Sequence, residues 1–384
     1  MSSEDLRQSV LYHETDPQAT QAEYTEFDNV DFVINVGEGR ALLKNSVRIL
    51  GDLRVNSAGA GPAGTRNAAA GLGFNRNAGA HSFFQSIQVS MQNSGLVENV
   101  QNYPRLVNML SVSSNAATDL INSDRICELR AFNDELTQLW TQGNTTYIVV
   151  GGVAEVTGPD DFDFSLKPMC ALNAMSGGDL AASKSGAITL TCNMARNIDA
   201  LSGKTQSNGT CAYSISNLRC TYQSVLADPK APVTGMRTTY NVKSNVLSGA
   251  ASISANVPAM CSGVSISFID TARDSTNTFD SYALERPLAI SEVQYLFNDQ
   301  TNSLVTYVIS DETEMLERFI SSMLNTGHNQ VSIDTFRANE GFALGLDFDG
   351  LIDLSKNRFT MQLQSAANSK PSNVYMYFHS VSSM

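Results

Sequence analysis

Two short acidic clusters are the residues whose spacing could do chemistry. One cluster is residues 160–163, with Asp161 and Asp163 separated by a phenylalanine, and the other holds Asp347 and Asp349, with Asp353 nearby. Paired carboxylates can serve as acid and base in glycoside hydrolysis when burial raises the pKa of one of them. Neither cluster matches the twelve-residue calcium loop. Acids that alternate with Phe also suit a solvent-facing strand edge, which is the interpretation we favour over a loosely held cation.

A glycine-rich stretch at residues 59–64 spells G-x-G-x-x-G, the pattern that cradles a pyrophosphate. That motif needs a helix opening at its last glycines and an acid about 20 residues further on. The next residues are Thr65 and Arg66, followed by more Ala, Gly and Asn, and the expected acid is replaced by Phe83, Phe84 and Gln85. We therefore predict a surface loop and no nucleotide cofactor.

The remaining reactive side chains are scattered along the chain. The four histidines have no His or Cys neighbours at metal-ligand spacing, and no G-x-S-x-G nucleophile motif is present. The six cysteines form no C-x-x-C pair and are expected to be small buried hydrophobes, not disulfide partners. We predict no catalytic residue, no cofactor-binding residue and no metal ligand. The histidines are His13, His81, His328 and His379, and the cysteines are Cys127, Cys170, Cys192, Cys211, Cys220 and Cys261.

The elements that would position these residues are mostly strands. Period-two alternation predicts strands around residues 32–36, 47–55, 87–91, 188–194 and 213–222 in the first half, with shorter ones at 147–150 and 153–156. Within 213–222 the alternation changes phase between Ile215 and Leu218, which predicts a β-bulge. Residues 97–110 carry apolar side chains at roughly helical spacing, with Pro104 near the expected start of that helix.

The second half repeats this style with one strong helix. Strands are expected around residues 264–268, 293–297, 304–309, 331–333, 342–346, 359–363 and 374–378. Ser310 or Asp311 can cap a helix whose apolar stripe includes Met315, Phe319 and Met323. Trp140 and the aromatic run at residues 375–378 are expected to fill cores.

The order of elements predicts an all-β fold of two tandem eight-stranded antiparallel jelly rolls with a few short inserted helices. Two prolines within residues 227–232 mark the boundary. We predict an N-terminal arm at residues 1–30, a first jelly roll at 31–226, a linker at 227–238 and a second jelly roll at 239–384.

Composition narrows the class of function. The chain has 384 residues, a formal net charge of −13 and only 16% charged residues, and no apolar run is long enough for a transmembrane helix. An acidic chain is poorly suited to wrapping nucleic acid, so no sequence-specific nucleic-acid binding is expected. The first residues have neither a basic start nor an apolar run, so no secretion signal is expected.

Seven segments, taken in order, carry a family resemblance. They are HSFFQSIQV at 81–89, VENV at 97–100, YPRL at 103–106, FSLKPM at 164–169, ISNLRCTY at 215–222, FALGLD at 342–347 and DLS at 353–355. In pattern and spacing the chain resembles the double jelly-roll major capsid proteins of tailless icosahedral double-stranded DNA viruses, over roughly residues 30–384. Its length is near the small end of that family.

The resemblance implies a structural role in a virion assembled inside the host cell. It implies a capsid subunit that forms a homotrimer, a pseudo-hexagonal building block that tiles an icosahedral shell. Implied partners are neighbouring capsomers, penton and minor capsid proteins, and an internal membrane met through the N-terminal arm, although residues 1–30 carry seven acids and a single Arg.

Two alternatives stay open at this stage. One is a β-sandwich glycoside hydrolase that uses Asp161, Asp163, Asp347 or Asp349. The other is an adhesion module of a phage or bacterium, which would need an export route or a fibre.

Overall fold

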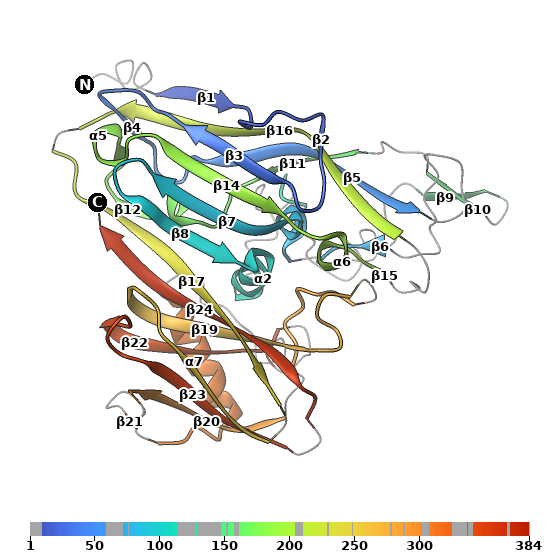
Figure 1. The fold of residues 1–384 in the computed structure, drawn as a ribbon, viewed down its shortest axis with the longest axis vertical. Coiled ribbons are helices and arrows are strands. Elements are labelled where there is room, and N and C mark those ends of the chain that lie inside the picture. Colours follow the sequence, from blue (N-terminus) through green and yellow to red (C-terminus); the bar gives the residue numbers. More distant parts are fainter. Residues whose placement is uncertain are drawn as a thin grey trace.

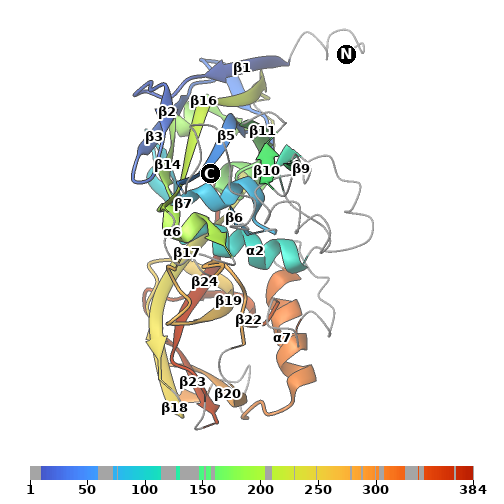
Figure 2. The ribbon, with the colours of Figure 1, turned by 90° about the vertical axis from the view of Figure 1, so that its right-hand side faces the viewer.

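The structure is a computed structural model. It describes residues 10–58, 72–75, 77–113, 127–129, 147–150, 153–156, 161–203, 210–228, 230–247, 249–276, 279–286, 289–298, 300–301, 307–324, 336, 341–366 and 369–383. Figure 1 shows the first half of the chain above the second, and Figure 2 shows the helices α2 and α7 on one side of the strands. Within the described residues, no helix has the length and apolarity needed to cross a membrane.

The first half consists of short strands and a few brief helices. They are β1 (Leu11–Thr15), β2 (Glu23–Tyr24), β3 (Asn29–Ile34), β4 (Arg40–Leu42), β5 (Arg48–Ala58), β6 (Leu72–Gly73), η2 (Gly79–Phe83), β7 (Phe84–Met91), β8 (Gly95–Gln101), α2 (Tyr103–Ser113), β9 (Tyr147–Val150), β10 (Val153–Val156), β11 (Asp161–Leu166), η4 (Ala171–Asn173), β12 (Met175–Gly177), β13 (Leu180–Ala181), α5 (Ala182–Ser185), β14 (Ile188–Met194), α6 (Asn197–Ala200), β15 (Ser202–Gly203) and β16 (Thr210–Leu226).

The second half has longer strands and one long helix. They are β17 (Thr234–Val246), β18 (Ala250–Ala255), β19 (Met260–Asp270), β20 (Ile290–Phe297), β21 (Gln300–Thr301), α7 (Glu312–Leu324), β22 (Ala343–Asp353), β23 (Phe359–Ser365) and β24 (Ser372–Ser383).

Each half is a sandwich of two sheets. The first pairs the sheet β11-β5-β16-β4-β13 with the strands β3, β14, β7 and β8, and the second pairs β18-β23-β20-β21 with β17, β24, β19 and β22. Aromatic rings fill the space between the sheets: Phe84 meets Phe164 at 6.5 Å between ring centroids, and Phe359 meets Phe378 at 5.5 Å. The predicted all-β fold of tandem jelly rolls is confirmed.

The two sandwiches share one sheet. The strand order β22-β19-β24-β17-β8-β7-β14-β3 runs through both halves. Its central joint is a parallel pairing of β8 with β17 at Asn99 and Tyr240, whereas the other pairings in this sheet are antiparallel among the described strands. The orientation of the halves is therefore set by few main-chain bonds and by the side chains around them.

Two local predictions are confirmed by the backbone. The phase change in β16 is a register shift between Ser216 and Arg219, with Asn217 at φ +50°. Asp311 caps α7, because its Oδ1 accepts the backbone N–H of Thr313 at 2.7 Å and of Glu314 at 3.2 Å. The apolar stripe of α7 is buried as expected and faces β22.

The helix predicted within residues 97–110, with Pro104 near its start, is confirmed as α2, which begins at Tyr103. Val97 and Val100 come before the helix, on β8, where they are buried on a paired strand. Within the predicted N-terminal arm, Leu11 begins β1, where it pairs with Ser224 of β16. The stretch between β16 and β17 spans residues 227–233. The predicted strands at 304–309 and 331–333 fall largely outside the described residues.

Candidate functional site

Buried charged side chains lie at the joint between the two halves of the described chain. Glu98 of β8 is 2% exposed. Its Oε1 accepts the backbone N–H of Thr239 on β17 at 2.7 Å, and its Oε2 accepts that of Ala171 on η4 at 2.6 Å. The Glu98 carboxylate thus serves as the acceptor for two backbone N–H groups that would otherwise bond to a carbonyl. It does so next to the pairing of Asn99 with Tyr240, where the strands of the two halves meet.

Burial controls the protonation of Glu98. Transfer out of water disfavours the charged carboxylate, and this raises the pKa of Glu98 to about 7, even though the two backbone N–H bonds act in the opposite direction. Both oxygens already accept hydrogen bonds from the protein. Glu98 therefore ties three segments together and is not positioned to serve as an acid or base for a substrate.

A second buried charge joins the halves through α2. Arg105 is 1% exposed and donates to the carbonyl oxygens of Ala283, at 2.9 Å, and of Ser281, both in the second half. Its guanidinium lies 4.4 Å from the ring centroid of Tyr375 and 3.8 Å from a carboxylate oxygen of Asp274. Arg105 therefore binds α2 of the first half to the segment between β19 and β20, through two of its carbonyls, and to the strand β24.

Asp274 is the anionic centre of this cluster. Its Oδ2 accepts hydrogen bonds from the Tyr375 hydroxyl at 2.7 Å and from Asn373 at 2.6 Å, and Lys243 lies 3.4 Å away. Burial alone would raise the pKa of Asp274, but Arg105, Tyr375 and Lys243 outweigh it and hold the pKa below its ordinary value. The carboxylate stays charged, as a buried partner for a guanidinium should.

A third group of polar contacts lies inside the first half, beneath α2. His81 is buried, and its Nδ1 lies 2.7 Å from the hydroxyl of Tyr103, which also accepts the backbone N–H of Met169 at 2.9 Å. Glu128 accepts the backbone N–H of Lys167 at 2.9 Å, and its other oxygen lies 3.5 Å from Nε2 of His81. These contacts fix the start of α2 and the segment that follows β11.

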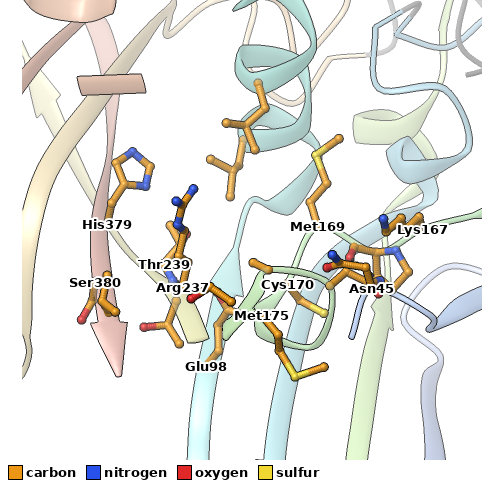
Figure 3. A pocket seen from close by; sticks show the side chains of 18 of the residues that line it. Asn45, Glu98, Lys167, Met169, Cys170, Met175, Arg237, Thr239, His379 and Ser380 are labelled. Carbon is orange, nitrogen blue, oxygen red and sulfur yellow. Dashed lines mark hydrogen bonds between the residues drawn. The ribbon is translucent and has the colours of Figure 1, made fainter. Parts of the chain in front are cut away.

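A cavity of about 460 Å³ lies at the joint, lined by Glu98 and Glu128 among others. Figure 3 shows His379 and Ser380 on one side, Lys167 and Met169 on the other, and Glu98 below them. Cys170 lines the cavity, but burial raises the pKa of its thiol far above the ordinary value, so it is not a reactive nucleophile. His379 is held by a 2.7 Å hydrogen bond to Ser265.

The sequence-predicted acidic clusters are not brought together into this site. Asp163 lies on β11 of the first half, exposed and opposite Asp52 of β5, whereas Asp347 and Asp349 lie on β22 of the second half. Asp349 is exposed within β22 at φ +52°, where the register of β22 with β19 shifts. Among the residues that the structure describes, no group of three or more His, Cys, Asp or Glu side chains could hold a metal ion.

Other predicted residues have structural surroundings or lie outside the described part. The five cysteines whose side chains are described are all unbridged, and all but Cys127 are buried. His13 stacks on Tyr222 at 4.8 Å and lies 2.7 Å from the Ser224 hydroxyl. The glycine-rich stretch at 59–64, Trp140, Asp160 and His328 lie outside the described residues.

Sequence reasoning did not single out Glu98, Arg105 or Asp274. A weak signal was present for the first two, because each is a lone charge among apolar neighbours, between Val97 and Val100 and between Tyr103 and Leu106. A charge in such a place must find a buried partner. The partner itself could not be read from the sequence, because Asp274 is 169 positions after Arg105.

Comparison with known proteins gives the fold a name. No family model and no curated protein matches the sequence. Among solved structures, the chain is similar to the Faustovirus major capsid protein (TM-score 0.60, 10% identity, covering 98% of this chain and 90% of that one). It is also similar to a chain of the Sputnik virophage structure (TM-score 0.63, 12% identity, covering 98% and 88%) and to a chain of the PBCV-1 virus capsid (TM-score 0.55, 9% identity, covering 98% and 94%).

These likenesses define the class of fold. Two sandwiches joined by a shared sheet, matched over nearly the whole length of the chain, are the double jelly roll of viral major capsid proteins. The predicted resemblance to that class is confirmed for the fold. At 9–12% identity the match concerns the fold.

Proposed function

We propose that the chain is a major capsid subunit that forms homotrimers and tiles an icosahedral shell. The joint carries this proposal. Two similar sandwiches are held side by side by a shared sheet, by Glu98 and by the Arg105–Asp274 cluster. A threefold arrangement of such a chain presents six similar lobes, a pseudo-hexagonal outline that fills a plane. Its role is structural, with no catalytic step.

The distribution of charge supports side-by-side packing. Residues 1–30 hold seven acids and one Arg, which is a formal charge of −6, so the other 354 residues carry −7 of the total of −13. A nearly neutral body whose surface is rich in Ser, Asn and Thr can pack many copies with little cost of desolvating charges. The acidic N-terminal arm is the segment we assign to a specific partner.

In this proposal the chain divides into an N-terminal arm, a first jelly roll, a linker around residues 227–233 and a second jelly roll. Its partners are copies of itself and neighbouring capsomers, together with penton and minor capsid proteins, and its location is the virion. The arm is the segment that would meet an internal membrane, where one is present. A cation at the acidic clusters forms no part of this proposal.

The mass of the purified protein in solution tests the proposal. Multi-angle light scattering should report three copies of the 41.4-kDa chain. Glu98→Gln, Arg105→Met and wild type should be compared in the same run, because a joint that sets the trimer's outline predicts weaker trimers for both variants. A strict monomer at all concentrations, for wild type, would overturn the proposal.

A further inference from the structure

The strand β18 is an open edge of the second sandwich. It pairs with β23 in antiparallel register, from Ala250 opposite Gln364 to Ala255 opposite Phe359. In the described part of the chain, β23 is the only strand it pairs with. Figure 2 shows β18 at the end of the molecule opposite to β1, away from the joint between the halves.

The register shows which peptide groups of β18 point outward. The backbone N–H of Ser365 donates to the carbonyl oxygen of Gly249 at 3.0 Å, so these two residues form a hydrogen-bonded pair. In an antiparallel ladder the hydrogen-bonded and non-hydrogen-bonded pairs alternate. The backbone groups of Ala250, Ser252 and Ser254 therefore point away from β23, and all three residues are exposed.

This edge lacks the devices that natural proteins use to block pairing. Edge strands are usually protected by charged residues, proline or a bulge. Residues 250–255 read AASISA, with no charge and no proline, and their register with β23 is unbroken. The outer face beside the edge is also almost uncharged, with a shallow hollow of about 330 Å³ lined by Gln294, Gln362, Gln364 and the single acid Glu292.

These observations fit a second copy of the same chain as the occupant. Two copies with a net charge of −13 repel one another over most of their surface, but an edge without charges meets its own copy without like-charge contacts. The side chains of β18 are Ala, Ser and one buried Ile, so they leave room for a strand at the usual spacing of about 4.8 Å.

We propose that β18 pairs with β18 of a second copy, antiparallel, about a twofold axis at Ser252. In this register Ser252 lies opposite Ser252 of the second copy, and Ala250 lies opposite Ser254. This register makes use of the outward groups of all three residues on both strands. Because a twofold contact cannot build a trimer, it links one trimer to the next. The inference rests on the proposed function and adds a specific contact between capsomers to it.

Cysteine cross-linking tests the register directly. In a hydrogen-bonded antiparallel pair the Cα atoms are about 5.5 Å apart, within the range that a disulfide spans. In a Cys127→Ser background, Ser252→Cys should form a covalent dimer under a mild oxidant. Ser254→Cys is the matched control: the two copies of residue 254 are separated by four positions, about 13 Å along the strands, and should not cross-link.

We expect about tenfold more covalent dimer from Ser252→Cys than from Ser254→Cys on a non-reducing gel. Equal dimer from the two variants, or none from Ser252→Cys under conditions in which trimers associate, would overturn the inference. Light scattering on the same samples separates the two proposals. Trimers without the Ser252→Cys dimer would refute the edge contact alone, whereas the dimer without trimers would refute the capsid assignment and leave the edge contact standing.

Discussion

Glu98→Gln should remove one pH-dependent contribution to stability. In the folded protein the pKa of Glu98 is raised from 4.5 to about 7 by burial. The folded chain therefore holds one more proton than the unfolded chain between these two values, and its stability falls as the pH rises through this window. The contribution is fully present below pH 4.5 and is lost above pH 7.

The size of the effect follows from the shift. Each pKa unit is worth about 1.4 kcal/mol, so a shift from 4.5 to about 7 corresponds to ~3 kcal/mol between acidic and neutral pH. Gln cannot ionise, so the variant lacks this slope. It also places an amide NH₂ against one of the two backbone N–H groups, which costs about 1–3 kcal/mol at every pH.

The assay is urea unfolding of wild type and variant at several pH values from 4.5 to 8. The free energy of unfolding of wild type minus that of Glu98→Gln should fall by ~3 kcal/mol as the pH rises, because the charged carboxylate is penalised only in the wild type. The difference should go from about 1–3 kcal/mol in favour of wild type at acidic pH to about zero, or in favour of the variant, at neutral pH. Glu38→Gln, at an exposed turn, is the matched control for removing one acid. Parallel curves for wild type and Glu98→Gln, or a difference that grows with pH, would refute the reasoning.

Three further predictions concern the packing that surrounds the joint and the second sandwich. Arg105→Met should destabilise the protein by about 3–5 kcal/mol, because it leaves Asp274 buried without its guanidinium, and Asp274→Asn in the same chain should restore part of the loss in a urea melt. Gly345→Val should lower the free energy of unfolding by about 1–3 kcal/mol in the same assay, because a Cβ at this position would overlap Ser322 of α7. Gly350→Val is the control: a Cβ there meets no atom within 4 Å, so its stability should differ from wild type only by the strand propensities of Gly and Val. Asp311→Ala should cost ~1 kcal/mol through loss of the α7 cap, and an unchanged melting temperature would show that the cap contributes nothing.

Most of the correct predictions came from local sequence patterns. The alternation of apolar and polar residues predicted the strands, because each half buries one face of each sheet. The bulge at Asn217 followed from a phase change between two apolar residues, since a register slip would otherwise turn a buried side chain toward solvent. The cap at Asp311 was predictable because the first N–H groups of a helix lack a backbone acceptor and a nearby carboxylate can supply one.

The joint could not be predicted in the same way. The hydrogen bond from Thr239 to Glu98 spans 141 positions, and Tyr240 meets Asn99 across the boundary between the halves. No local pattern encodes such pairings, because they depend on how two finished sandwiches dock. The residues just before α2 show the same dependence on tertiary structure: apolar spacing over residues 97–110 is compatible with a helix, but pairing with β7 keeps the chain in a strand up to Gln101.

In the proposed capsomer, each of three chains supplies two lobes held in a fixed orientation. Cryo-electron microscopy of the purified oligomer can show this arrangement. We expect projections along the threefold axis with six similar lobes in a pseudo-hexagonal outline, each pair of lobes matching the two sandwiches in the orientation set by Glu98 and Arg105. An oligomer with three lobes, or with the two sandwiches of each chain in variable orientation, would contradict it.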